Sequence, residues 1–365
     1  MNIAKTIPVL IVDDSIMRST LASMLPEAGD IAVVGMARDP FEVHQLIVAH
    51  RPSVIVLSSL AQVDSLTFLK KLVASYHAPI ILCPDVSPMS SRIAMEAVEA
   101  GAIDVVHKPP VAGGNQALRK FCDELILKIR TAALAKLVRP TVVVSKSTGN
   151  ASFREAGLDP SRYLVLIGAS TGGTEALQVL LDHVPSDFPA TAIVQHMPEG
   201  FTESFAGRLN QTSELIVTEA VQRDSLIPGR AFLARGGIQM MVHGSSGQLR
   251  LAYGTSELVN RHCPSVDVLF DSAARSLGRQ VVGVILTGMG DDGARGLLKL
   301  RQAGAVTFGQ DPASCVVYGM PKVAFELGGV EHQAPPAEIP RLIIKALQAR
   351  LKDRPALKGT LASSA

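Results

Sequence analysis

The chain has 365 residues, more than a single hydrophobic core commonly serves, so we expect two domains and a connecting segment. Its 35 Lys and Arg residues nearly balance its 33 Asp and Glu residues, and the formal net charge is +2. This balance argues against a nucleic-acid-binding protein, which needs basic residues gathered on one face. No apolar stretch approaches the ~20 residues of a membrane span, so we expect no membrane insertion.

The start of the chain and the cysteines both indicate a cytoplasmic protein. The first apolar run ends at Asp13 and Asp14, without the small-residue cleavage site of a secretion signal. The four cysteines are too scattered for a zinc knuckle or a redox pair. We therefore expect reduced, buried thiols at Cys83, Cys122, Cys263 and Cys315.

Short apolar runs alternate with helical patterns over the first third of the chain. Strands are predicted at residues 8–12, 31–36, 54–57, 79–83 and 103–106. Apolar residues spaced by three and four predict helices at 17–26, 41–50, 66–76, 89–100 and 117–134. Five such units predict a doubly wound parallel sheet over residues 1–130, with ligand chemistry at the carboxyl ends of its strands.

A change of composition separates this region from the rest. Residues 139–160 are rich in Ser, Thr, Gly and Pro, so we place a linker at 131–160, in which 141–144 could pair as an edge strand. Alternating patterns over 161–352 predict a second, mostly parallel α/β domain, and 353–365 a disordered tail. Its strands are expected at 163–167, 190–195, 214–217, 231–234, 249–253, 281–286 and 305–309. Its helices are expected at 174–184, 201–211, 266–277 and 294–303.

A glycine-rich turn follows the first strand of the second domain. Residues 168–173 read GASTGG and lead into a helix that opens at Thr174. The spacing Gly168-x-Ser170-x-Gly172 fits an elbow that exposes a nucleophilic serine beside helix amides able to hold an oxyanion. A phosphate-binding turn of the dinucleotide type fits the same spacing. Spacing alone therefore leaves both interpretations open.

Two later strand ends carry the groups that a nucleophilic serine needs. One predicted strand ends at His196, and another runs into TGMGDDG, which contains Asp291 and Asp292. A lone histidine is more commonly structural, and acids at a helix start are commonly caps. Together with Ser170, however, three strand ends supply the nucleophile, base and orienting carboxylate of acyl transfer. The order Ser–His–Asp differs from that of α/β-hydrolases, so we expect another fold.

Longer strings surround these residues. They are IGASTGGTEAL (167–177), IVQHMPEGFTESFAGRLN (193–210), PSVDVLF (264–270), GVILTGMGDDGARGL (283–297) and CVVYGMPK (315–322). In this order they resemble the chemotaxis protein-glutamate methylesterases, which are also protein-glutamine glutaminases. The resemblance spans the whole second domain and implies hydrolysis of glutamate γ-methyl esters, and deamidation of glutamines, on the helical cytoplasmic domain of chemoreceptors.

The resemblance also implies the roles of individual residues. Ser170 matches the nucleophile, His196 the general base and Asp292 the orienting carboxylate, with no metal and no cofactor for catalysis. The oxyanion hole and substrate groove would include Thr171, Met289 and Gly290. The family usually carries a proline and a histidine at the positions of Arg235 and Gln239, and we expect these two departures to alter the rim of the groove or its docking surface, leaving the chemistry intact.

The first domain resembles a response-regulator receiver. VLIVDDS (9–15) is similar to its opening, in which Asp13 and Asp14 would help to bind Mg²⁺, and GAIDVVHKP (101–109) is similar to its last strand, which ends in the phosphate-sensing Lys108. The position of the phosphoacceptor aspartate is occupied by Ser58, and Pro84 stands where a hydroxyl residue is usual.

These changes remove the groups that phosphorylation needs. An unactivated serine hydroxyl is a weak nucleophile, and loss of the carboxylate removes a hard ligand of the metal, so Mg²⁺ binding is doubtful. We predict that the receiver controls access to Ser170 by partner binding or interdomain packing and not by aspartyl phosphorylation. A chemotaxis histidine kinase or another docking protein is the candidate partner.

Two alternatives belong to other functional classes. A catalytically silent regulatory binding protein of the same fold would not need Ser170, His196 and Asp292 together. A nucleotide-dependent oxidoreductase would need an acidic ribose-binding residue ~20 positions after the glycine turn, whereas the next strand ends at His196.

Overall fold

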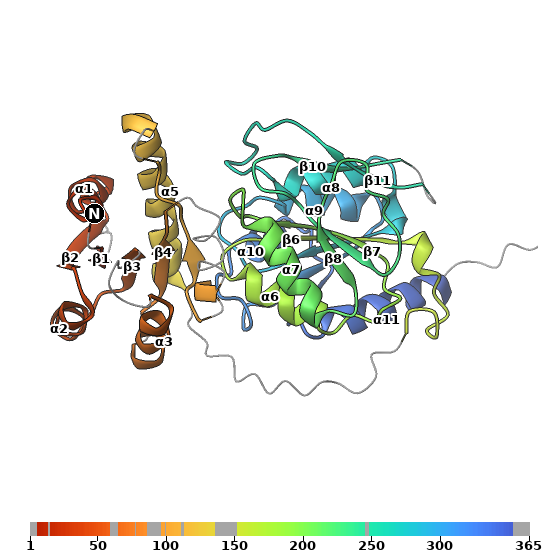
Figure 1. Ribbon diagram of the computed structural model, residues 1–365. Coiled ribbons are helices and arrows are strands. Elements are labelled where there is room, and N and C mark those ends of the chain that lie inside the picture. Colours follow the sequence, from red (N-terminus) through yellow and green to blue (C-terminus); the bar gives the residue numbers. More distant parts are fainter. Residues whose placement is uncertain are drawn as a thin grey trace, which may run out of the picture.

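A computed structural model of the protein describes residues 6–13, 15–58, 65–76, 78–85, 96–98, 100–110, 113–135, 152–244 and 248–352. Within them the chain forms two α/β regions, each built on a parallel sheet, as the sequence predicts (Figure 1). Asp14, the tail 353–365, the suggested edge strand 141–144 and most of the helix predicted at 89–100 lie outside the described residues.

The first region is a five-stranded parallel sheet with the order β2-β1-β3-β4-β5. Its strands are β1 (Ile7–Val12), β2 (Ile31–Ala37), β3 (Val54–Ser58), β4 (Ile80–Cys83) and β5 (Asp104–Val105). Its helices are α1 (Met17–Met24), α2 (Pro40–His50), α3 (Ser65–Ser75) and α5 (Gly114–Leu134), with a 3₁₀ turn at Leu25–Ala28. The order reverses direction at β1, so the ends of β1 and β3 form the edge where ligands bind in such sheets.

The second region is a seven-stranded sheet with the order β14-β13-β12-β6-β7-β9-β8, in which every pairing is parallel. Its strands are β6 (Leu164–Ala169), β7 (Ala190–Gln195), β8 (Ile216–Glu219), β9 (Arg230–Leu233), β12 (Val281–Ile285), β13 (Val306–Gln310) and β14 (His332–Ala334). The helices are α6 (Gly173–Leu181), α7 (Thr202–Thr212), α8 (Val266–Ala274), α9 (Ala294–Gln302), α10 (Met320–Glu326) and α11 (Ile339–Lys352). Short 3₁₀ turns lie at Pro160–Arg162 and Gly278–Gln280.

Some elements of this region were not predicted from the sequence. The strand expected at 249–253 is β11 (Arg250–Tyr253), but it lies outside the main sheet and pairs antiparallel with β10 (Met240–His243). Neither β10 nor β14 was expected, and the same holds for α10 and α11. β10 has four residues and β14 has three, which is too few for periodicity to distinguish a strand from a loop.

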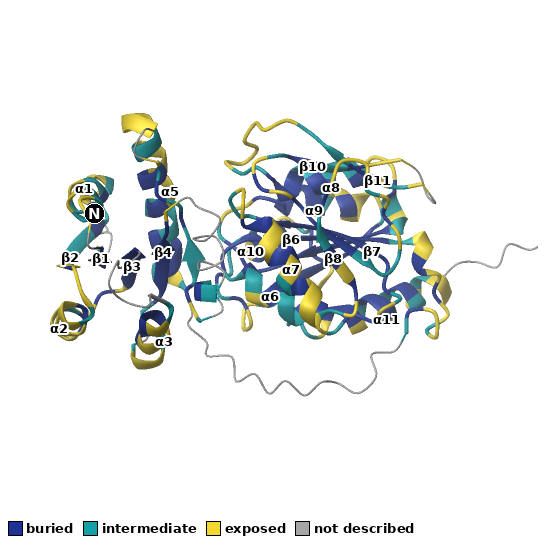
Figure 2. Ribbon diagram, viewed as in Figure 1, coloured by how far each residue is buried: buried dark blue, intermediate teal, exposed yellow. Residues whose placement is uncertain are grey.

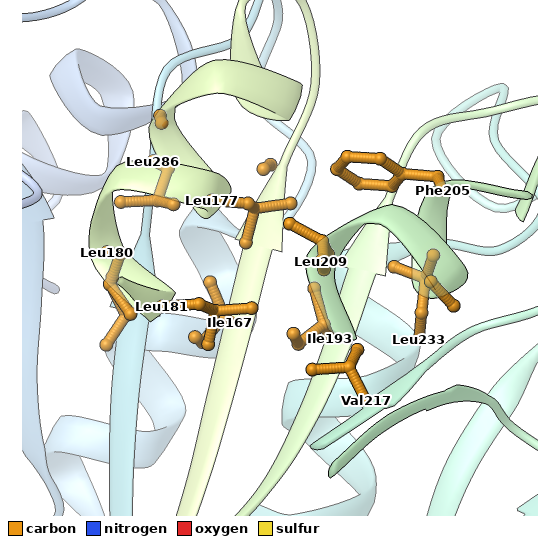
Figure 3. Packing of buried hydrophobic residues seen from close by; sticks show 14 of the residues in the cluster. Ile167, Leu177, Leu180, Leu181, Ile193, Phe205, Leu209, Val217, Leu233 and Leu286 are labelled. Carbon is orange, nitrogen blue, oxygen red and sulfur yellow. The ribbon is translucent and has the colours of Figure 1, made fainter. Parts of the chain in front are cut away.

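Helices cover both faces of the second sheet, and the strand residues alternate between them. Along β6, Val165 and Ile167 pack with the apolar face of α6, whereas Leu164 and Leu166 pack with α8 and α9. Figure 3 shows the first of these layers, with the leucines of α6 against Ile167 and Ile193. Each fully buried Leu or Ile contributes roughly 1.5–3 kcal/mol. Figure 2 shows the result, buried strands under helices whose outer faces are exposed.

The cysteines follow the expectation in part. Cys83, Cys122 and Cys315 are buried thiols outside any disulfide, but Cys263 is partly exposed. Cys263 was expected to be buried because cysteines are usually core residues. It lies instead in the loop between β11 and α8, which borders the site described below.

Candidate active site

Ser170 lies in a tight turn between β6 and α6, as the glycine spacing predicts. The strand ends at Ala169 and the helix begins at Gly173, with Gly172 in the left-handed region at φ +75°. A Cβ on Gly172 would lie 2.5 Å from Val316 Cβ, so the turn has room only for glycine there. Ser170 itself is 5% exposed.

His196 is brought beside this turn by the pairing of β6 with β7. Ala169 is in register with Gln195, and the His196 amide donates to Ala169 O at 3.0 Å. The side chain of Gln195 strengthens the junction, because its Nε2 donates to Ser170 O at 2.9 Å. Parallel strand ends thus bring Ser170 and His196 to one edge of the sheet.

Asp292 holds the histidine from the loop after β12. Its Oδ2 lies 2.8 Å from His196 Nε2, and both side chains are almost fully buried. The carboxylate also accepts from Ser265 Oγ (2.7 Å), Val266 N (2.7 Å) and Asn260 Nδ2 (2.8 Å). Burial alone would raise the pKa of Asp292. The hydrogen bond and the charge of His196, together with hydrogen bonds from Asn260 and Ser265, hold this pKa well below its usual range. Asp292 is therefore ionised.

The second nitrogen of His196 has no partner. Nδ1 is buried and makes no hydrogen bond, and within the described residues the Ser170 hydroxyl does not donate to the histidine. Hydrogen bonds of this kind commonly tighten only when substrate binds. Since Nε2 is held by Asp292, Nδ1 is the nitrogen able to accept a proton.

The loop after β12 approaches the serine closely. A Cβ on Gly288 would lie 2.6 Å from Ser170 Cβ, and Thr287 Oγ1 donates to Thr171 O at 3.0 Å. Within the described part of the chain, the amides of Thr171, Met289 and Gly290 donate no hydrogen bond. Free amides grouped beside a serine are suited to hold an oxyanion.

The sequence analysis missed two residues of this site. The ring of His262 stacks on that of His196, with centroids 3.6 Å apart and planes 7° apart. Burial, and then the charge of His196, lower the pKa of His262 to about 3, so the ring is neutral near neutral pH. Asn260 bridges Asp292 and Asp267 through its amide nitrogen. Both lie just before the string PSVDVLF, which was the available signal.

One expectation about the groove rim was wrong. Arg235 is exposed and pairs with Glu199 at 2.9 Å, as a rim residue would. Gln239, however, is 2% exposed. Its amide donates to the carbonyls of Glu257 and His262, at 2.9 and 3.0 Å, and accepts from Ser265 N at 2.8 Å. Gln239 is buried because it satisfies backbone groups of the loop that carries His262.

The receiver residues meet at the ends of β1 and β3. Lys108 Nζ lies 2.9 Å from Asp13 Oδ2, and Ser58 is 1% exposed. Burial raises the pKa of Asp13, but the hydroxyls of Ser15 and Ser58 and the ammonium of Lys108 together lower it. Asp13 is thus a buried carboxylate already paired with an ammonium. Asp14 is outside the described residues.

The receiver contacts the rim of the serine site through residues of β5 and α5, and α5 lies on the side of the receiver that faces the second domain (Figure 1). Asp104 Oδ2 accepts from Thr171 Oγ1 and from Lys128 Nζ, both at 2.8 Å. Thr131 of α5 contacts the sulfur of Met289. The ring of His107 packs on Phe201, with centroids 4.3 Å apart. The two residues flanking the proposed oxyanion position thus both contact the receiver.

The described residues contain no helix that is long and apolar enough to cross a membrane. They also contain no group of three or more His, Cys, Asp or Glu side chains placed to hold a metal ion.

A serine elbow, an aspartate-held histidine and free amides at the carboxyl edge of a parallel sheet define a serine-hydrolase site on an α/β fold. The family described as CheB methylesterase matches residues 165–343. A protein-glutamate methylesterase/protein-glutamine glutaminase of Chromobacterium violaceum is 42% identical over 90% of this chain and 97% of its own length. A second such enzyme, from Syntrophomonas wolfei, is 44% identical over 91% of this chain and 95% of its own length. The chain belongs to the CheB methylesterase family.

Solved structures resemble parts of the chain. The CheB methylesterase catalytic domain of Thermotoga maritima is 37% identical, with a TM-score of 0.49, over 50% of this chain and 98% of its own. The response regulator domain of the same organism's CheB is 28% identical, with a TM-score of 0.33, over 36% of this chain and 99% of its own.

Replacement of Asp292 by Asn tests the electrostatic role of this carboxylate. We expect Asp292→Asn to lower the rate of ester hydrolysis by roughly 10³–10⁴-fold, because the charge that stabilises a protonated His196 is lost. It should also destabilise the fold by about 1–3 kcal/mol, since buried donors lose an acceptor. The measurements are ester hydrolysis and urea unfolding followed by circular dichroism, as the chain has no Trp.

The neighbouring Asp291 is exposed and supplies the matched control. Asp291→Asn should leave the rate unchanged and the stability within about 0.5 kcal/mol. Equal effects of the two substitutions would contradict the assignment.

Proposed function

We propose that this protein hydrolyses glutamate γ-methyl esters of chemoreceptors, and deamidates their glutamines, with Ser170, His196 and Asp292 as its catalytic triad. The observation that carries the proposal is the 2.8 Å contact between His196 and an ionised Asp292, at the strand end next to Ser170. Family membership supports the same reaction.

The chemistry follows from the geometry of the site. His196 Nδ1 takes the Ser170 proton as the hydroxyl attacks the ester carbonyl, and Asp292 stabilises the resulting imidazolium. The amides of Thr171, Met289 and Gly290 hold the oxyanion. Methanol leaves with the proton from His196, and water activated by the same nitrogen hydrolyses the acyl-enzyme to a receptor carboxylate. With a glutamine substrate the leaving group is ammonia.

The substrate in this proposal is the helical cytoplasmic domain of a chemoreceptor, so the reaction takes place in the cytoplasm. A chemotaxis histidine kinase or another docking protein is the proposed partner of the receiver. The mechanism uses only side chains and backbone amides and requires no cofactor. We assign residues 1–130 to regulation, 131–160 to the linker and 161–352 to catalysis.

Methanol release tests the reaction directly. Purified protein should release methanol from methylated chemoreceptor membranes, and Ser170→Ala should reduce release to the background rate because the nucleophile is lost. Ser276→Ala, at an exposed serine of the same domain, is the control and should be fully active. A wild-type protein that releases no methanol would favour a silent regulatory role.

We further propose that the receiver restricts access to Ser170 by packing on its rim, without aspartyl phosphorylation. The contacts of Asp104 with Thr171 and of Thr131 with Met289 support the packing. The paired Lys108 and Asp13, beside Ser58, support the loss of phosphorylation.

Incubation with acetyl phosphate and Mg²⁺ tests whether the receiver acts without phosphorylation. Intact mass should show no added phosphoryl group, and the esterase rate should not change, because a serine hydroxyl is a weak nucleophile and Ser58 supplies no carboxylate to the metal. Ser58→Asp, which restores the carboxylate, is the comparison. A phosphorylated wild-type protein with a raised rate would overturn the proposal.

Disruption of the contact between Asp104 and Thr171 tests whether the receiver restricts access to Ser170. Asp104→Ala should raise the basal esterase rate, since it removes the bond to Thr171 that ties the receiver to the rim. Asp30→Ala is the control. It breaks a 2.8 Å ion pair with Arg130 of α5, the helix that also carries Lys128, and it should not change the rate. Equal rates for wild type and Asp104→Ala would argue that the receiver does not cover the site.

A further inference from the structure

A two-residue turn places His262 against the candidate active site. Val259 and His262 exchange backbone hydrogen bonds of 3.0 and 2.9 Å, and the residues between them, Asn260 and Arg261, have φ values of +51° and +69°. Two successive non-glycine residues in the left-handed region are costly, and such backbone persists only where its surroundings hold it.

The surroundings of this turn supply that support. Asn260 Nδ2 donates to Asp292 at 2.8 Å and to Asp267 at 2.7 Å. The buried amide of Gln239 donates to His262 O at 3.0 Å. The turn is therefore anchored to the same carboxylate that holds His196.

The ring of His196 needs a second restraint. Among the described residues, its one side-chain hydrogen bond is through Nε2 to Asp292, and Nδ1 has no partner there. One hydrogen bond leaves an imidazole free to tilt about the axis of that bond. The parallel ring of His262, 3.6 Å away, blocks the tilt on one face. Together the two contacts fix where Nδ1 points.

We propose that His262 is a positioning residue, an uncharged aromatic plate that holds the plane of His196 so that Nδ1 faces the Ser170 hydroxyl. This rests on the proposed role of His196 as the general base. The groups whose charges act on His262 are His196, Asp292, Lys128 and Arg261. Burial and the cations lower the pKa of His262, Asp292 opposes them, and the net effect keeps the ring neutral in the pH range of turnover. A neutral ring also tolerates the imidazolium that forms on His196, whereas a charged one would repel it.

Three substitutions in the full-length protein separate a plate from a proton carrier. His262→Phe keeps a flat ring and loses both nitrogens, His262→Leu keeps apolar volume without a flat face, and His262→Ala removes the side chain. We expect His262→Phe to retain kcat within about threefold of wild type. The Leu and Ala variants should lose roughly 10–100-fold in kcat with little change in KM, as expected for a misoriented base.

The pH profile distinguishes a positioning role from proton transfer by His262. His262→Phe should leave the acid limb of kcat/KM where wild type has it, because burial lowers the pKa of His262 to about 3 and the limb belongs to another group. The assays use methanol release from methylated receptor membranes, with circular dichroism to verify folding. If the Ala variant does not fold, the comparison of Phe with Leu decides.

Several outcomes would overturn the inference. A Phe variant as slow as the Ala or Leu variant, or with a displaced acid limb, would make a ring nitrogen essential and His262 a proton carrier. Wild-type rates in all three variants would show that His196 keeps its orientation without the ring of His262. Failure of the proposed function is distinct, because then the wild-type protein itself would release no methanol or Ser170→Ala would remain active.

Discussion

A single buried carboxylate, that of Asp292, organises the active edge of the second domain. A charge removed from water is costly unless hydrogen bonds replace its hydration. Here the replacements come from His196, from the turn at Asn260 and from the start of α8. Ser265, the residue before α8, does not cap the helix with its own side chain, and Asp292 accepts the Val266 amide instead. The group that orients the histidine therefore also caps α8.

The sequence predicted those parts of the site that depend on strand ends. Apolar runs locate β6, β7 and β12, and the rule that parallel strands end at one edge brings Ser170, His196 and Asp292 together. The spacing of the glycines adds the elbow. These predictions rely on local pattern and topology, which a single sequence contains.

The sequence could not predict the parts that depend on loops. His262 lies in a non-periodic segment, and its place on His196 follows from a turn fixed by Asn260 and Gln239, which are distant in sequence from each other. Gln239 was misplaced for a related reason. Its glycine-rich neighbourhood is typical of an exposed loop, yet the backbone carbonyls around it need donors and draw its amide inside.

The capping role of Asp292 ties one side of the site to the core of the second domain. If the loop after β12 moved away from His196, the first amides of α8 would lose their acceptor and a buried charge would lose its donors. The side that holds the base is consequently built as part of the core. On the opposite side, the Thr171 hydroxyl and the Met289 sulfur are held by Asp104 and Thr131, which belong to a different domain. The entrance to the site is therefore held by contacts between two domains, whereas the histidine is held by contacts within one.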